Sequence, residues 1–112
     1  MAISSDLLRG YTDAIILHCL AKGDSYGYQI SKEIFSASGG KLELKEATLY
    51  TAFRRMETSG YIRSYWGDET IGARRRYYRL TDEGKAKLTE ESRMWRETRD
   101  VLNKLLEGED KE

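Results

Sequence analysis

The last third of the chain constrains the fold most, because it has the pattern of one long helix. Thr81 is a good N-cap, and Asp82 and Glu83 suit the positive end of a helix dipole. No proline interrupts the segment, so the helix can continue to about Leu106. The apolar face of a helix of this length must pack either against the rest of a small domain or against another surface.

Apolar side chains in this helix follow a heptad pattern, which predicts that a second chain covers them. The a positions are Leu88, Trp95 and Leu102, the d positions are Glu91, Thr98 and Leu105, and Met94 and Val101 flank the seam. The stripe is too hydrophobic to leave wet, and a chain of 112 residues has room for one modest core. The stripe packs worst around Trp95, where the d positions are polar, and a flat ring there suits a ligand slot better than a dry interface.

Three shorter helices are predicted ahead of this one. The first is capped by Asp6, ends at Gly23 and carries the stripe Leu7, Leu8, Tyr11, Ala14, Ile15, Leu17 and Leu20. The second is capped by Ser25, ends at residues 38–40 and carries Tyr28, Ile30, Ile34 and Phe35, and residues 41–44 then form a brief strand or turn. The third runs from about Glu46 to Ser59 and buries Leu49, Ala52, Phe53 and Met56 before Gly60 stops it.

Two strand-like runs, residues 61–66 and 75–80, lie between the third helix and the last one. Both alternate and are rich in aromatic and β-branched residues, and the segment between them predicts an exposed hairpin loop. The order is that of a winged helix-turn-helix with an extra helix: a mainly α fold with a β-hairpin wing. We expect a DNA-binding domain over residues 1–80, a dimerisation helix over 81–107 and a flexible tail over 108–112. Winged helices also serve as protein-interaction modules, so the plan alone leaves that alternative open.

Composition and charge exclude several classes of function. The single Cys19 and the single His18 are too few for a structural zinc site or a catalytic set, so neither an enzyme nor a cofactor or metal is expected. One cysteine fits a reducing cytosol, Cys19 itself is expected to pack internally, and no apolar run is long enough to span a membrane. The formal net charge of zero hides a basic middle, residues 45–80, which is where a polyanion would bind.

The residues expected to contact DNA lie on the third helix, at the hairpin and at the start of the second helix. In a helix-turn-helix the second helix of the pair enters the major groove, and here it would present Lys45, Ala47, Tyr50, Thr51 and Arg54. Tyr26 and the amide of Gly27 lie at a helix N-terminus, which suits a phosphate. For Tyr50, DNA contact and packing under the wing remain equal alternatives.

The hairpin carries three consecutive arginines, Arg74, Arg75 and Arg76. On a strand the first and third point to one side and the second to the other. Such a wing can straddle a phosphate backbone or place an arginine in a minor groove. Tyr77 and Tyr78, which follow, are expected to be half-buried sheet residues.

Three sequence blocks together resemble the signature of PadR-type transcriptional regulators. They are "SYGYQISKEI", "KEATLYTAFRRMETSGYIRSYWGDE" and "GARRRYYRLTDEGK", within a match over roughly residues 7–88. The single long C-terminal helix resembles the small subfamily of these proteins. The resemblance implies a homodimer that represses by binding a palindromic double-stranded operator and is released by a small molecule.

The resemblance also implies roles for individual residues. A dimer interface would form from the first and last helices, through Leu8, Tyr11, Ile15, Leu88, Leu102, Leu105 and Leu106. Within the subfamily the chain is similar to multidrug-sensing repressors of lactic acid bacteria, in which a tryptophan of the last helix stacks planar aromatic drugs, and Trp95 falls on that position. The implied ligand contacts are Trp95, Ala14, Leu7 and Arg99.

Two points stay open at the level of the sequence. Arg99 stands where those relatives carry an acid, and Asp100 is turned about 100° away on the helix, so the charge of the effector is not defined. Trp95 could also simply pack against the first helix of the partner chain, which would make the protein a PadR-type regulator without a small-molecule ligand.

Overall fold

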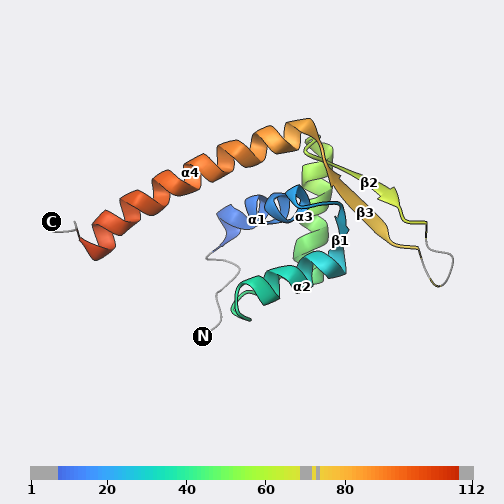
Figure 1. The fold of residues 1–112 in the computed structure, drawn as a ribbon, viewed down its shortest axis with the longest axis horizontal. Helices are drawn as coiled ribbons and strands as arrows, with labels where there is room; N and C mark the ends of the chain where they lie inside the picture. The colour runs from blue at the N-terminus through green and yellow to red at the C-terminus, as the bar shows by residue number, and fades with distance from the viewer. Residues whose placement is uncertain (1–7, 69–71, 73, 109–112) are drawn as a thin grey trace.

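The computed structural model describes residues 8–68, 72 and 74–108, and it places the helices and strands in the predicted order. Figure 1 shows the shorter helices and a small sheet gathered together, with the C-terminal end of the last helix extending away from them. The elements are a 3-10 turn at Arg9–Tyr11, α1 Thr12–Ala21, β1 Ser25–Tyr26, α2 Gly27–Ala37, α3 Glu46–Thr58, β2 Ile62–Trp66, β3 Arg76–Leu80 and α4 Asp82–Glu107.

The sheet has three strands in the order β1-β3-β2, all antiparallel. Ile62 pairs with Leu80 and Trp66 with Arg76, so β2 and β3 form the predicted hairpin. Side chains alternate between the two faces: Ile62, Tyr78 and Leu80 are buried on the inner one. The prediction that Tyr77 and Tyr78 are sheet residues is confirmed, since Tyr78 is buried and Tyr77 partly so.

β1 was not predicted, and it corrects the assignment of Ser25 as a helix cap. Ser25 pairs with Tyr78 of β3, and its hydroxyl donates to the Gln29 side chain at 2.7 Å. The residue before α2 is Tyr26, whose side chain makes no capping hydrogen bond. Pairing with β3 thus holds Ser25 in an extended strand. The N-cap position of α2 is one residue later, at Tyr26.

Three further details differ from the predictions. α1 begins only at Thr12, after the 3-10 turn, while the proposed cap Asp6 lies outside the described residues. Of the four apolar side chains on the predicted stripe of α2, Ile30 and Ile34 are buried, whereas Tyr28 and Phe35 are exposed. Residues 41–44, predicted as a brief strand or turn, form neither and connect α2 to α3 without regular structure.

The core lies between the three short helices and the inner face of the sheet. Its largest buried side chains are Phe53, Ile16, Leu17, Ile30, Leu49, Met56 and Ile62. The ring of Phe53 stacks on that of Tyr78 with centroids 4.1 Å apart, which joins α3 to the wing. Burial of Leu42 and Leu44 fixes the connection between α2 and α3 against this core.

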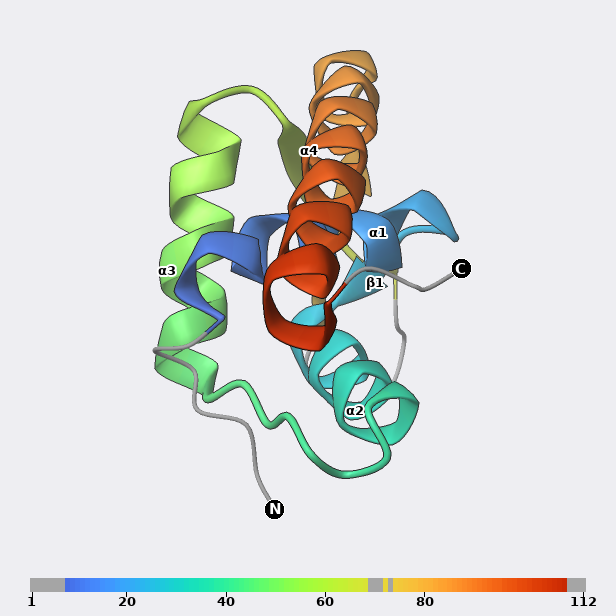
Figure 2. The same cartoon turned by 90° about the vertical axis from the view of Figure 1, so that its left-hand side faces the viewer.

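α4 begins as predicted and leaves the domain along its own axis. The Thr81 hydroxyl accepts from the Gly84 N–H at 2.9 Å and donates to the Gly60 carbonyl at 2.7 Å, so the cap also ties α4 to the turn after α3. The first half of α4 lies along α1, as both views show, while its C-terminal half projects past the other helices (Figures 1 and 2). The structure is accordingly elongated, 60 × 32 × 21 Å.

Candidate functional site

The exposed face of α3 carries the side chains predicted for it. Lys45, which precedes the helix, and Ala47, Tyr50, Thr51 and Arg54 are all exposed, whereas Leu49, Ala52, Phe53 and Met56 are buried. Tyr50 is 40% exposed, and its ring meets the Phe53 ring edge-on with a centroid distance of 5.6 Å. The helix therefore presents a polar, cationic face outward while Tyr50 also contacts the core.

A notch between α2, α3 and the wing collects most of the remaining predicted DNA-binding residues. Its volume is about 590 Å³, and it is lined by Tyr26, Gly27, Tyr28, Tyr50, Trp66, Arg74, Arg75 and Arg76. Three arginines and three tyrosines thus line one concave surface beside the N-terminus of α2. Guanidinium and phenol groups are donors that suit phosphate oxygens.

The other residues of the predicted set lie around α3 in neighbouring hollows. Lys45 lines one with Gly27 and Tyr50, between α2 and α3. Ala47 and Thr51 line another on the side of α1. Arg54 lines a third beneath the wing. The structure therefore spreads the set around the exposed face of α3 and its flanks.

The three hairpin arginines occupy different environments. The Arg74 Nε donates to the Gly67 carbonyl at 3.1 Å, and the Arg75 guanidinium lies over the Tyr26 ring at 4.9 Å. Arg76 turns the other way and donates to the Ser64 hydroxyl at 2.8 Å. β3 begins only at Arg76, so the alternation predicted for a strand covering all three does not extend to Arg74.

Gly27 has a steric role that the sequence did not reveal. A Cβ at this position would lie 2.8 Å from the Tyr50 hydroxyl oxygen, closer than such atoms normally approach. The missing side chain lets Tyr50 reach the first turn of α2. Gly27 therefore shapes the notch in addition to offering its amide.

The outer face of the sheet holds a row of three tyrosines. Tyr77 lies between Tyr26, at 5.3 Å, and Tyr65, at 5.6 Å. The Asp24 carboxylate accepts from the Tyr65 hydroxyl at 2.6 Å and from the Arg79 Nε at 3.2 Å, and it raises the pKa of Tyr65. Asp24 thus fastens the loop before β1 to the wing, a contact across 41 or more residues that no local sequence pattern signals.

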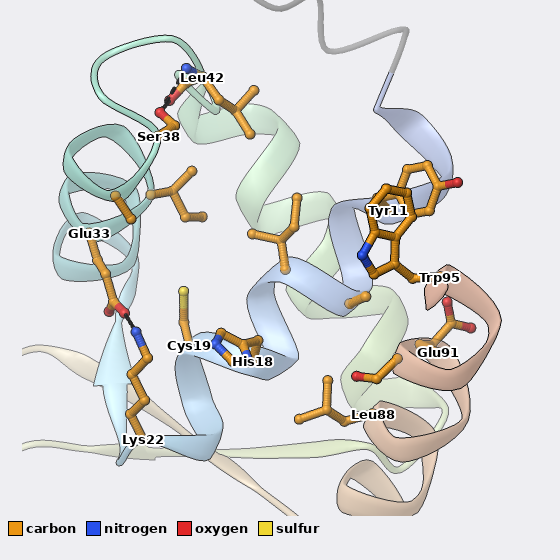
Figure 3. Close-up of a pocket in the computed structure, with 15 residues that line it drawn as sticks. Tyr11, His18, Cys19, Lys22, Glu33, Ser38, Leu42, Leu88, Glu91 and Trp95 are labelled. Atoms are coloured by element: carbon orange, nitrogen blue, oxygen red, sulfur yellow. Dashed lines mark hydrogen bonds and ion pairs between the residues drawn. The ribbon is translucent and has the colours of Figure 1, made fainter. Parts of the chain in front are cut away.

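A second concave surface, a cleft of about 430 Å³, lies between α1, α2 and α4. Most of its lining is apolar, and it includes Tyr11, Ala14, Ile15, Leu88, Glu91 and Trp95. Trp95 is 43% exposed, and its ring meets the Tyr11 ring edge-on with centroids 5.4 Å apart (Figure 3). The predicted ligand residues Trp95 and Ala14 are thus brought together, whereas Leu7 lies outside the described residues and Arg99 does not line the cleft but pairs with Asp100 at 3.1 Å.

The carboxylates of this cleft are already paired with lysines. Glu33 accepts from Lys22 at 2.6 Å, as Figure 3 shows, and Glu91 lies 3.1 Å from Lys87. These contacts raise the pKa values of both lysines. Cys19 also lines the cleft, and burial raises the pKa of its thiol to about 11, so the thiol is unreactive at neutral pH, in agreement with a packing role.

The residues predicted for a dimer interface divide into two groups. Leu8, Ile15 and Leu88 are partly buried against the core of their own chain. Leu105 and Leu106, in contrast, are 73% and 79% exposed, and Val101 and Leu102 beside them are also exposed. The C-terminal half of α4 therefore carries an apolar surface that nothing within the described part of the chain covers.

Two kinds of site are absent from the described residues. No group of three or more His, Cys, Asp or Glu side chains is arranged to hold a metal ion among them. None of the helices described is long and apolar enough to cross a membrane.

The fold and the basic notch define a winged helix-turn-helix protein with an added C-terminal helix. The PadR-like family of transcriptional regulators matches residues 16–90. The chain belongs to this family, which makes it a transcriptional regulator and not an enzyme.

Individual relatives agree with this assignment. An uncharacterised protein of Lysinibacillus sphaericus is 42% identical over 106 residues, covering 95% of this chain and 97% of its own. A transcriptional regulator from Clostridium thermocellum has 48% identity and a TM-score of 0.84, covering 90% of this chain and 98% of its own. A PadR family transcription regulator from Clostridium difficile has 41% identity and a TM-score of 0.76, with coverages of 86% and 98%.

Proposed function

We propose that the protein is a homodimeric repressor that binds a palindromic operator and is released by a planar aromatic small molecule. The observation that carries the DNA-binding part is the notch of about 590 Å³, in which residues of α2, α3 and the wing converge. Phosphate backbone fits this notch because Arg74, Arg75 and the first turn of α2 all offer donors to it. The exposed face of α3 then reads base edges in the major groove.

The division of labour within this surface follows from reach and chemistry. Ala47 and Thr51 allow close approach and offer a methyl and a hydroxyl to bases, while Lys45 and Arg54 supply charge at the two ends of the face. Tyr50 belongs to α3 and also lines the notch. Arg75, stacked on Tyr26 at 4.9 Å, is held ready for a phosphate or a minor groove.

The DNA-binding proposal is tested by selecting duplexes from a random pool and measuring their affinity by gel shift. Arg74→Ala combined with Arg75→Ala should weaken binding of the selected duplex and lower the salt slope by about two units. Arg63→Ala, an exposed arginine on the outer face of the sheet, serves as the control for loss of charge alone. Failure of the wild type to enrich any sequence would favour a protein-interaction module instead.

The exposed C-terminal half of α4 supports the homodimer. Val101, Leu102, Leu105 and Leu106 form an apolar surface on a helix segment that projects from the domain. A second copy of the chain offers a matching surface, as two-fold assemblies require. Leu105→Glu with Leu106→Glu should convert a sedimenting dimer into a monomer, whereas Lys104→Glu, on the same turn, should leave the dimer intact.

The cleft beside Trp95 supports the effector. A volume of about 430 Å³ and a largely apolar lining suit a small planar molecule, and the indole presents an accessible face. Because Glu33 and Glu91 are both paired with lysines of the same chain, we propose that the flat ring system, rather than a charge, is recognised.

Fluorescence titration tests the effector proposal. Phenazine, which is neutral, and 9-aminoacridine, a cation, should both quench the wild type and lose this effect in Trp95→Ala. Trp66 also fluoresces, so the difference between the two proteins is the informative quantity. Equal binding of both compounds to a dimeric Trp95→Ala variant would refute the role of Trp95.

A further inference from the structure

A compact polar cluster links the end of α3 to both strands of the wing. The Ser64 hydroxyl of β2 donates to Glu57 Oε2 at 2.6 Å. Arg76 of β3 donates to the Ser64 hydroxyl at 2.8 Å and lies 3.6 Å from Glu57 Oε1. The side chains of Glu57, Ser64 and Arg76 thus join α3, the proposed recognition helix, to both strands of the hairpin.

The strand register explains why these groups meet. Ser64 stands opposite Tyr78, and Trp66 opposite Arg76, so Ser64 and Arg76 both belong to the face of the sheet that looks toward α3. The Arg76 guanidinium also lies over the Trp66 ring at 5.8 Å. Both carboxylate oxygens of Glu57 are engaged, and its side chain is 35% exposed, so these contacts are screened less than those of a fully exposed pair.

The cluster borders a hollow at the junction of α3 and the wing. A cavity of about 250 Å³ lies between α3 and the hairpin, lined by Tyr50, Arg54, Glu57, Arg76 and Tyr78. Packing of Phe53 on Tyr78 joins the middle of the hairpin to the core. Ser64 stands opposite Tyr78 and joins β2 to Glu57 at the same level, and Arg76 extends the Glu57 cluster toward the hairpin loop.

A carboxylate at this place opposes the binding of a polyanion. Glu57 lies in the basic segment of the chain, beside Arg54 and Arg76, and its charge repels phosphates by simple electrostatics. If repulsion were the only effect of Glu57, removing its charge should strengthen DNA binding. A role in holding the wing predicts the opposite sign.

We propose that Glu57 is a positioning residue that sets the angle of the wing relative to the recognition helix through Ser64 and Arg76. The inference rests on the proposed DNA-binding function. It assigns to Glu57 and Ser64 no contact with DNA. Glu57 and Ser64 hold Arg74 and Arg75, which precede β3, at a fixed distance from α3. At this distance α3 can enter the major groove while the two arginines reach the phosphate backbone.

The test compares three variants on one duplex selected by the wild type. Glu57→Gln keeps the shape of the side chain and removes its charge, and Ser64→Ala removes the bridging hydroxyl without changing charge. Each should weaken binding by about threefold to tenfold, and the double variant should weaken it by less than the product of the two, because they break one cluster. Asp68→Asn, an exposed acid just after β2, is the matched control for charge removal and should bind as well as the wild type or better.

A second readout separates positioning from general loss of structure. In a Trp95→Phe background, Trp66 is the single tryptophan, and its emission anisotropy reports the wing directly. Glu57→Gln should lower this anisotropy while leaving the circular dichroism spectrum of the helices unchanged.

The outcomes separate the inference from the function on which it rests. A wild type that selects no duplex defeats the DNA-binding proposal itself. Tighter binding by Glu57→Gln, or unchanged Trp66 anisotropy with unchanged affinity, overturns the positioning role while leaving the DNA-binding function intact.

Discussion

Substitution of Gly84 by alanine tests how closely α4 approaches the turn after α3. Gly84 is buried in the first turn of α4, and its N–H donates to the Thr81 hydroxyl at 2.9 Å. An added Cβ would lie 2.1 Å from the Tyr61 carbonyl oxygen and 2.7 Å from a methyl carbon of Leu80. Both distances are far shorter than van der Waals contact, so the chain must shift to accept alanine.

Two opposing effects determine the change in the free energy of unfolding. Alanine is favoured over glycine within a helix by about 0.8–1 kcal/mol. Overpacking costs about 1–3 kcal/mol and occasionally more. The Tyr61 carbonyl cannot swing aside easily, since it is backbone and accepts from the Thr81 N–H at 3.1 Å, so a shift also weakens the cap, which is worth about 1 kcal/mol. We expect a net loss of about 2 kcal/mol.

Urea unfolding followed by circular dichroism measures this loss. Protein concentration must be equal for all variants, because the stability of a dimer depends on it. Ala86→Gly, an exposed position of the same helix, reports helix propensity alone and should cost about 0.5–1 kcal/mol. If Gly84→Ala proves as stable as the wild type or more so, propensity outweighs contact and the reasoning is refuted.

Three further predictions concern the notch, the cleft and the cap. Gly27→Ala should displace the Tyr50 ring and weaken DNA binding by about 1 kcal/mol, roughly fivefold, while in a Tyr50→Phe background it should cost much less, as gel shifts would show. Burial raises the pKa of Cys19 from 9.0 to about 11, so the folded state favours the protonated thiol. The Cys19 contribution to stability should be constant below pH 9 and fall between pH 9 and 11, so urea midpoints should fall less steeply over this range in Cys19→Ala than in the wild type. Thr81→Ala should lose about 0.5–2 kcal/mol of unfolding free energy, and Thr81→Ser, which keeps the hydroxyl, should restore most of it.

Local patterns predicted those parts of the fold that neighbouring residues determine. Helical spacing identified the buried face of α3, and alternation placed both wing strands within one residue of their observed bounds. The Thr81 cap was predicted because capping depends on residues three positions apart. In each case the sequence signal and the physical cause lie within a few residues of each other.

Contacts between distant segments escaped prediction for the same reason. β1 has only two residues and exists because β3 pairs with it. The contacts of Asp24 with Tyr65 and of Glu57 with Ser64 depend on how the wing packs, which no periodicity encodes. Gly27 had a recognisable place at a helix start, but its close contact with Tyr50 required the angle between α2 and α3.

The residues of the apolar stripe of α4 lie in different surroundings along the helix. The heptad count treated Leu88, Trp95 and Leu102 as equivalent, yet Leu88 packs on the core of its own chain while Leu102 is exposed. Trp95 lies between them, in edge contact with Tyr11 of the 3-10 turn before α1, and is still 43% exposed. In the proposed dimer Trp95 therefore lies at the boundary between the part of α4 that packs on its own chain and the part that packs on the partner chain. A ligand inserted at that point would separate α4 from α1 or from the partner chain, and either movement would change the spacing of the two α3 helices in the proposed dimer. The position of Trp95 at this junction, more than its exposure, is what links the proposed effector to DNA binding.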